Sequence, residues 1–535
     1  MTTPLPPNTE LNQSTEQNGA RLAEPGSSSS VRRHTKSSIS ELSSVLNART
    51  SISTFPPEVL AEVLLHCARL HDEEEVKIVA KLSIQHYRWL YITQISHRWR
   101  AIALDTPRLW ARIGANVHPR LLEEVFRRSK EAPVDIYAYL GSKVERVQKF
   151  IELFRRNISR VRSLDFRLHR CRITPGNLEN MARAPLLRSF LLANIHGEEG
   201  KESPMTTLFS TDMPLLNHIE IYSTSFVFNK VYFLPTLTYV RLSAPFVGSN
   251  NPRGRGPSWD ALKEVLTSLP LLEDLYLDNI FPYVPPNSVL PSGHNPTILP
   301  RVKFLHIMGG GFQVAHFFRR IFVPASATFD IYVKTLDDEQ ELLEIFEPTF
   351  RMRFHPSQNP DFENETPFLT FAARYTSPLA LRLRLWTEVI PDTYLGLEIP
   401  DLVPKLSINI ETTTHNPTNI MEVIIPDLVV EEVESLSLDG LTEVSISIWT
   451  NVLVRMSKLK TIRLTEQAGE FLPEVLTANH LKEPPILPGE CHTLRIFPHV
   501  KTIIFENVNM MQLPRGRTEG NLRCVSTSGM LRFNE

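Results

Sequence analysis

The sequence predicts a protein of mixed α and β structure, in which a small all-helical region precedes a long array of repeated strands. Three observations lead to this fold class. The composition changes near residue 55, before which the chain contains no Phe, Trp or Tyr. Apolar stripes at helical spacing occupy residues 55–113. A short apolar motif then recurs through the rest of the chain.

The composition of the 535-residue chain argues against several classes of protein. Its 57 Lys and Arg nearly balance 59 Asp and Glu, and the net charge of −2 lacks the basic excess typical of nucleic-acid-binding proteins. The four cysteines lie far apart without CxxC spacing, so we expect neither a disulfide framework nor a zinc ribbon. No apolar run approaches the roughly 18 residues of a membrane span, and no secretory signal opens the sequence. We therefore expect a soluble protein of the cytoplasm, the nucleus or both, with no membrane or nucleic-acid partner.

The two ends of the chain differ from the region between them. Residues 1–54 lack aromatic side chains and contain the low-complexity run Gly26–Ser30, so they cannot bury enough apolar surface to offset the entropy lost on ordering. We expect a disordered Ser/Thr-rich tail over residues 1–54. A second, loose tail is expected over residues 510–535.

Residues 55–113 carry three apolar stripes at helical spacing. Phe55-Pro56-Pro57-Glu58 is typical of a helix start, because proline is favoured at the first helical position and an acidic residue suits the positive end of the helix dipole. Thr106-Pro107 predicts another start. The apolar residues are Val59, Leu60, Val63, Leu64 and Cys67, then Ile92, Ile95, Trp99, Ile102 and Ala103, then Leu109, Trp110 and Ile113. So small a unit cannot hide all of this surface in its own core, so we expect it to dock onto a partner.

From residue 114 the pattern changes to an internal repeat. A helix is expected over residues 121–128 and a strand over 134–136, after which the motif L-x-x-L-x-L occurs nine times, often with a proline two residues before it. The first apolar residues of the nine copies are Val161, Leu187, Leu216, Leu237, Leu272, Val302, Val433, Leu459 and Val500. The uneven recurrence predicts an irregular leucine-rich-repeat-like solenoid over residues 114–509, each repeat being a short strand with a return segment. One helical return is expected after a cap at Ser258.

Residues 308–430 fit the repeat poorly. Strand-like alternation occurs at Leu379–Leu385 and at Leu406–Ile410, and Asp337-x-x-Gln340 resembles a capping box before a helix. We expect this middle region to continue the same solenoid with irregular repeats.

The repeat also predicts a binding face. Side chains alternate along a strand, so the motif leucines point inward and the residues between them point outward. The outward set is Asp165, Arg167, Glu220, Tyr222, Tyr239, Arg241, Asp274, Tyr276, Asp278, His306 and Arg463. Tyr and Arg are frequent among binding hot spots, so this face suits a polar or basic segment of a protein target. The alternative is that these residues are polar only for solubility.

Three motifs within residues 55–113 follow one another in the order found in F-box domains. They are Phe55 to Leu64 against the family pattern L-P-x-E-[IVL]-L, Ile95 to Ala103 against V-C-[RK]-x-W-R-x-[LIV]-A, and Pro107-Arg108-Leu109-Trp110 against P-x-L-W. The region therefore resembles an F-box domain, with Phe55 in place of the usual leucine, Ser96 where cysteine is common, and a long insertion around residues 69–88. The remaining chain resembles the continuation found in mushroom-type fungal F-box proteins.

The resemblance implies a substrate-recruiting adaptor subunit of a Skp–cullin–F-box ubiquitin ligase. The F-box-like helices would bind a Skp-type adaptor, and through it a cullin, while the repeats would bind a protein target. The residues expected to contact the adaptor are Phe55, Pro56, Val59, Leu60, Val63, Leu64, Ile92, Ile95, Trp99, Ile102, Leu109 and Trp110. Such a subunit needs no catalytic residue, because it acts by holding the target close to the charged ubiquitin thioester.

Enzyme motifs offer little competition to this interpretation. The segment from His306 to Gly311 superficially resembles an oxyanion loop of hydrolases, but no G-x-S-x-G elbow occurs, and its glycines are expected to form a turn after a strand. His480, Cys491, His492 and His499 do not fit zinc spacing. We expect no catalytic residue, metal or cofactor. The main alternative is a leucine-rich scaffold that engages no ubiquitin ligase, and a hydrolase is more remote.

Overall fold

The computed structural model describes most of the chain between residues 54 and 532. The described residues are 54–73, 87–141, 144–168, 183–194, 213–223, 233–244, 257–282, 296–336, 366–377, 379–391, 402–412, 419–441, 444–465, 468, 472, 497, 499–506, 523–525 and 530–532. The expected N-terminal tail before Thr54, most of the C-terminal tail and the capping box at Asp337 lie outside them. The chain divides into two compact units, and the described part of the first comprises residues 54–73 and 87–109. The second unit begins its main run at Trp110.

The first unit is helical. Its elements are α2 (Pro57–Glu73), the 3₁₀ helix η2 (Arg88–Gln94), α4 (His97–Asp105) and the start of the 3₁₀ helix η3 (Pro107–Trp110). Pro57 opens α2 as predicted, and the Ser96 side chain caps α4 by accepting from the Trp99 amide at 3.2 Å. Arg98 Nη2 donates to the Phe55 carbonyl at 2.6 Å, which ties α4 to the start of α2.

The third predicted helix is shorter than its apolar stripe suggested. It ends at Trp110, and Ile113 lies in strand β1 (Arg112–Gly114), which pairs in parallel with β2 (Val134–Leu140). The backbone of residues 112–114 is extended because it forms hydrogen bonds with the edge of a sheet. Between these strands, α5 (Pro119–Arg128) ends at Ser129, close to the predicted end.

A large, mostly parallel sheet forms the second unit. From β2, parallel pairing continues in chain order through β3 (Val161–Leu168), β4 (Ser189–Asn194), β5 (His218–Ser223), β6 (Tyr239–Ser243), β7 (Asp274–Asp278), β9 (Phe304–Gly310) and β11 (Thr328–Leu336). Each of the nine motif copies provides a strand of this sheet, the last three being β15 (Ser435–Asp439), β16 (Thr461–Thr465) and β17 (Thr502–Glu506). The motif therefore located these strands correctly.

The irregular middle lies within the same sheet but changes its strand order. Strand β11 pairs in parallel with β14 (Leu406–Thr412), which pairs antiparallel with β13 (Ala380–Trp386), and β13 pairs antiparallel with β12 (Thr370–Ser377). Strand β12 then pairs in parallel with β15, so the sheet continues without a break. Both predicted strands of this region are confirmed at β13 and β14. At the far edge, β19 (Met530–Arg532) pairs antiparallel with β17 and with β18 (Arg523–Val525).

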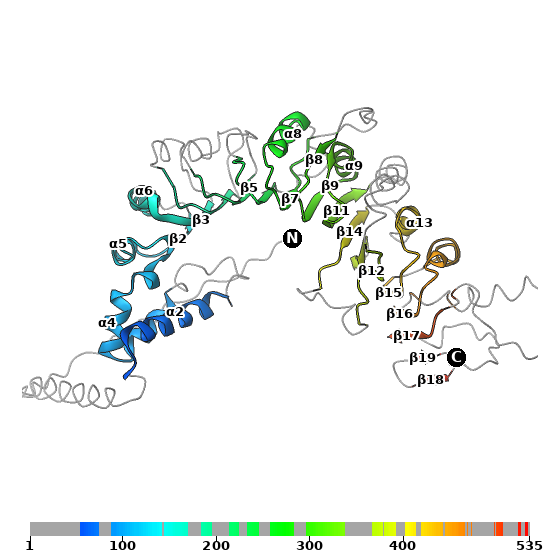
Figure 1. Cartoon of the computed structure of the whole chain (residues 1–535), viewed down its shortest axis with the longest axis horizontal. Coiled ribbons are helices and arrows are strands. Elements are labelled where there is room, and N and C mark those ends of the chain that lie inside the picture. The colour runs from blue at the N-terminus through cyan, green and yellow to red at the C-terminus, as the bar shows by residue number, and fades with distance from the viewer. Residues whose placement is uncertain are drawn as a thin grey trace, which may run out of the picture. The chain divides into compact units, whose positions relative to one another are not determined.

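Helices α6 (Val144–Asn157), α8 (Trp259–Thr267), α9 (Gly311–Arg320) and α13 (Asn419–Ile424) lie on one face of the sheet (Figure 1). Ser258 caps α8 as predicted, accepting from the Ala261 amide at 3.2 Å. The core lies between these helices and the motif leucines, of which Leu275 and Leu277 are fully buried. The faces of the strands that point away from the helices therefore carry the intervening side chains.

The glycines after His306 form no turn, so that prediction is wrong. Gly309 and Gly310 end β9, and Gly311 begins α9 directly. A Cβ at Gly309 would lie 2.9 Å from Cδ2 of Phe281, so a residue without a side chain is needed for Phe281 to pack against this strand end.

Candidate functional site

The twelve residues predicted to contact an adaptor separate by burial. Leu60, Leu64 and Trp99 are buried in the first unit, as is Leu109, and so they belong to its core. Trp110 is buried in the second unit, where the Arg128 guanidinium lies 5.2 Å from the centre of its ring. Val63, Ile92 and Ile102 are half-buried, and Phe55, Pro56, Val59 and Ile95 are exposed.

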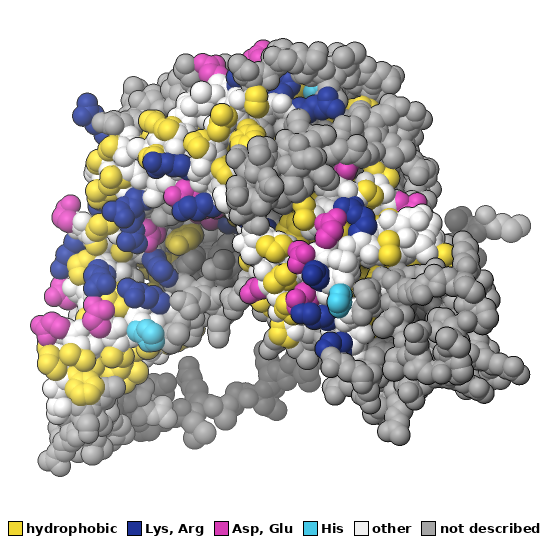
Figure 2. Space-filling view, turned by 45° about the vertical axis from the view of Figure 1, so that its right-hand side comes forward, with side chains coloured by type: hydrophobic (Ala, Val, Ile, Leu, Met, Phe, Trp, Pro, Cys, Tyr) yellow, Lys and Arg dark blue, Asp and Glu magenta, His cyan; other side chains and the backbone are white. Residues whose placement is uncertain are grey.

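Large apolar side chains are exposed on the first unit. Phe55, just before α2, is 42% exposed, and Val59 in its first turn is 44% exposed. Tyr91 within η2 is 73% exposed, and Ile95, which caps the end of η2, is 56% exposed. We call these four residues the apolar surface of the first unit. Hydrophobic side chains gather on the first unit (Figure 2). Because α2 and η2 pack against each other, these exposed side chains make the first unit a candidate binding surface.

Tyr91 was missed by sequence reasoning. It lies in η2, between the first two F-box-like motifs, and its neighbours Trp89 and Leu90 carry no amphipathic pattern of helical period. In a 3₁₀ helix the residues repeat every third position, so the 3.6-residue pattern used to read the stripes could not find it.

The predicted target-binding residues lie on the face of the sheet that points away from the helices. Cross-strand partners form two neighbouring rows on this face. The central row is Glu220, Arg241, Tyr276, His306 and Asp330, one residue from each of β5, β6, β7, β9 and β11. The outer row is His218, Tyr239, Asp274 and Phe304. Directly opposed side chains on parallel strands lie close enough to interact, so each row is a continuous strip of contacts.

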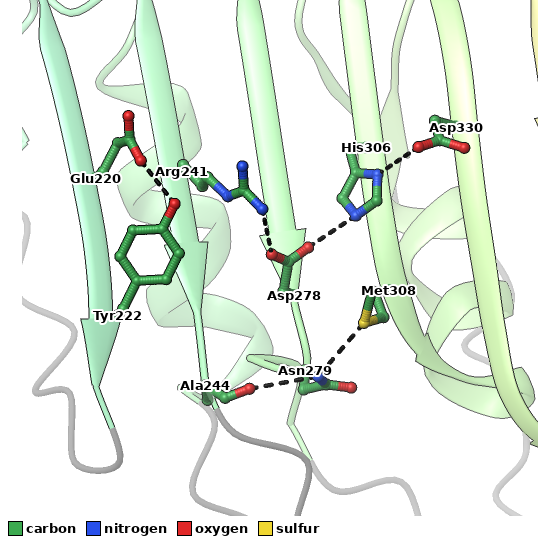
Figure 3. Close-up of polar contacts among 9 residues, drawn as sticks. All are labelled: Glu220, Tyr222, Arg241, Ala244, Asp278, Asn279, His306, Met308 and Asp330. Atoms are coloured by element: carbon green, nitrogen blue, oxygen red, sulfur yellow. Dashed lines mark hydrogen bonds and ion pairs between the residues drawn. The ribbon is translucent and has the colours of Figure 1, made fainter. Parts of the chain in front are cut away.

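Ion pairs connect the central row to the end of β7 (Figure 3). Arg241 Nη2 lies 3.4 Å from Asp278 Oδ2, and His306 Nε2 lies 2.9 Å from Asp278 Oδ1. The other ring nitrogen of His306, Nδ1, lies 2.8 Å from Asp330 Oδ2. His306 therefore bridges two carboxylates, and Asp278 sits between two cations. We call Arg241, Asp278, His306 and Asp330 the charged cluster.

The charged cluster holds His306 in its protonated form. Burial alone lowers the pKa of His306, but the hydrogen bonds and charges of Asp278 and Asp330 outweigh it and raise this pKa to about 9. Burial likewise tends to raise the pKa of the Asp330 carboxyl, yet the His306 contact lowers it below its usual value. Asp278 was expected to be exposed. It lies on the predicted face but is only 5% exposed, because the two cations cover it.

Aromatic rings enclose Arg241. Its guanidinium carbon lies 5.4 Å from the centre of the Tyr222 ring and 5.2 Å from that of Tyr276. The Tyr222 hydroxyl donates to Glu220 Oε2 at 2.7 Å, and burial together with this carboxylate raises the pKa of Tyr222. The neighbours of Arg241 thus hold its side chain in place. Arg241 therefore stabilises this face of the sheet and is less available to contact a target.

The remaining predicted residues make local pairs or none. Arg167 binds Asp165 on β3 at 2.8 Å, and Arg463 binds Glu506 across β16 and β17 at 2.6 Å. Neither pair belongs to the charged cluster. Asp274 has no hydrogen-bond or ion-pair partner for its carboxylate among the described residues.

Three residues of the rows, His218, Phe304 and Asp330, were missed, and Phe304 occupies the same motif position as Tyr239 and Asp274. His218 occupies the same motif position as Tyr239 and Asp274, so the alternation already contained the signal for it. Asp330 lies in β11, where the motif is altered. In the regular motif the first apolar residue lies three positions before the second, as Val302 lies before Leu305 at β9. The equivalent residues at β11, Ala327 and Phe329, are only two positions apart.

Metal and membrane sites are not indicated in the part of the chain that the structure describes. There, no three His, Cys, Asp or Glu side chains come together as a metal site would require. Nor does any described helix combine the length and apolar character needed to cross a bilayer. No known protein-family model matches this chain, and a search of curated proteins finds no match either.

Proposed function

We propose that the protein is the substrate-recruiting adaptor subunit of a Skp–cullin–F-box ubiquitin ligase. In this role the first unit binds a Skp-type adaptor, and the polar face of the sheet binds a protein target. The observation that carries the proposal is the apolar surface of the first unit. Phe55, Val59 and Ile95 belong to the segments that resemble F-box motifs, and they are exposed where a core role would bury them.

The contacts within the first unit support the same interpretation. Ser96 caps α4, Arg98 binds the Phe55 carbonyl, and Arg108 pairs with Glu62 at 2.7 Å. These three residues lie in the second and third F-box-like motifs and fix α4 and the start of η3 against α2. The motif residues thus divide into some that hold the helices together and some that face solvent. Such a division suits a rigid platform for a partner.

Catalysis by this subunit would be proximity alone. A target bound on the sheet face would be held close to a ubiquitin thioester carried by a separate conjugating enzyme. Raising the effective concentration of a target lysine in this way needs no acid, base or nucleophile on this chain.

The test uses substitutions that charge the apolar surface without touching the core. Val59→Glu and Ile95→Glu should each abolish co-purification with a purified Skp-type adaptor, because a carboxylate buried without a partner at an interface costs several kcal/mol. Both side chains are largely exposed, so the free protein should fold normally. Trp99 is unsuitable for this test because it belongs to the core.

Val389→Glu is the matched control, because Val389 is also an exposed valine, 51% accessible, but lies in the second unit. It should leave adaptor binding at the wild-type level. Wild-type binding by Val59→Glu and Ile95→Glu would contradict the proposed docking surface. A wild-type protein that binds no Skp-type adaptor would favour the alternative, a scaffold that engages no ubiquitin ligase.

A further inference from the structure

Asp274 differs from the other carboxylates of the polar face. Glu220, Asp278 and Asp330 each contact a cation, a hydroxyl or both, whereas the Asp274 carboxylate has no such partner among the described residues. The side chain is half-buried at the start of β7. A half-buried carboxylate without a hydrogen bond or an ion pair is unfavourable, and it is the kind of group that a ligand can satisfy.

Aromatic rings frame this carboxylate. Tyr239 and Phe304 are the cross-strand partners of Asp274 on either side, and Tyr276 lies two residues further along the same strand. The Tyr276 ring centre is 5.1 Å from that of Tyr239 and 5.1 Å from that of Phe304, so the three rings form a continuous border. His218 extends the border by stacking on Tyr239 at 3.9 Å.

We propose that this frame binds a lysine or arginine side chain of the target protein, with the cation over the aromatic rings and against the Asp274 carboxylate. The inference rests on the proposed function, because it treats the sheet face as the target-binding surface. Ring faces carry negative potential and attract cations, and the carboxylate adds a full negative charge. An anionic ligand would be repelled, and an apolar one would leave Asp274 desolvated without a partner.

The charges around Asp274 compensate its carboxylate only in part. Burial and the neighbouring Glu273 carboxylate raise the pKa of Asp274 despite the opposing charges of Lys303 and His218, so its negative charge is only partly compensated. The nearest lysine, Lys303, is engaged by Glu273 at 2.7 Å, and its side chain is 70% exposed. Lys303 could itself occupy the position proposed for the target's cation. Its removal should therefore not weaken binding of a cation from another protein.

The probe is a nonapeptide library in which the central residue is fixed as each amino acid in turn, bound to the immobilised full-length protein. Libraries with central Lys or Arg should be retained about tenfold more than those with central Ala or Glu. Asp274→Asn should abolish this preference. Asp260→Asn, the same chemical change on helix α8 at the other face of the sheet, should keep it, as should Lys303→Gln.

Substitution of a ring separates the aromatic contribution from the charge. Phe304→Tyr keeps an aromatic face and should preserve the preference, while Phe304→Leu should reduce it several-fold. Equal retention of Lys, Ala and Glu libraries by the wild-type protein, or an unchanged preference in Asp274→Asn, would overturn the inference. Co-purification with the Skp-type adaptor is measured on the same variants. Adaptor binding without a basic preference defeats this inference alone, and a basic preference without adaptor binding defeats only the ligase role.

Discussion

The helical unit and the polar face of the sheet unit differ in the kind of side chain that they expose to solvent. On the helical unit, Phe55, Val59, Tyr91 and Ile95 are exposed and apolar. On the strands from β5 to β11, the apolar motif residues are buried, and the opposite face carries charges that mostly pair with each other. Binding to the first surface would gain from burying apolar area. Binding to the second requires a ligand that matches an existing pattern of charges and rings.

This difference indicates how selective each surface can be. Apolar burial is non-directional and roughly proportional to area, which suits one constant partner. The sheet face has only a few groups left to satisfy, Asp274 among them, and unmatched charges there penalise wrong partners. The proposed subunit, which would join one fixed adaptor to a chosen target, would use both kinds of surface.

The largest effect is expected from breaking the charged cluster. Asp278→Ala leaves Arg241 and His306 without the carboxylate between them, and should lower the free energy of unfolding by about 3 kcal/mol. Asp165→Ala removes a more exposed pair within one strand and should cost less than about 1 kcal/mol. Urea unfolding of both variants measures the contrast. Equal costs would mean that the cluster does not stabilise the sheet.

A comparable effect is expected from pH. The folded pKa of His306 is raised to about 9, above the unfolded value of about 6.5, so its protonation stabilises the fold fully below pH 6.5. As pH rises through 9 the folded state loses that proton, and stability should fall by about 3 kcal/mol in total between these limits. Urea midpoints measured from pH 6 to 10 test this.

Another histidine, His316 on helix α9, provides the control for the pH series. Burial lowers the pKa of His316 to about 4, so this ring is neutral in the folded protein and titrates only on the acid side. His316→Gln should leave the alkaline loss of stability unchanged, while His306→Gln should remove it. Persistence of the alkaline loss in His306→Gln would assign it to another group.

The sequence located strands far better than it located their contacts. The motif found β3 to β7, β9 and β15 to β17 because buried leucines must alternate on a strand packed against helices. It missed β11, because the buried residue in the turn before this strand is the small Ala327, which lies one position closer to the next buried residue, Phe329, than in a regular copy. It could not predict the antiparallel pairing of β12, β13 and β14, because strand order depends on contacts between segments far apart in sequence.

The candidate sites show the same limit. The alternation along each strand predicted that Arg241, Asp278 and His306 lie on one face of the sheet. It could not predict that they contact each other, because this depends on the parallel register of β6, β7 and β9. Apolar stripes named the residues of the first unit, but could not separate the buried Leu60 from the exposed Val59 beside it. Burial within a small helical unit depends on how its helices cross.

The smallest effect on stability is expected at the most exposed residue of the comparison. Tyr91 is 73% exposed, so Tyr91→Ser removes little buried area and should change the free energy of unfolding by less than about 0.5 kcal/mol. The same change should nevertheless weaken adaptor binding at least tenfold if the apolar surface is a docking site, because tyrosine contributes large contact area at interface centres. Calorimetric titration with a purified Skp-type adaptor measures the affinity, and Val403→Ser, at a valine of the second unit that is 58% exposed, is the control. Unchanged affinity in Tyr91→Ser would restrict the docking surface to α2 and Ile95. Loss of stability without loss of affinity would show instead that Tyr91 is part of the fold of the unit.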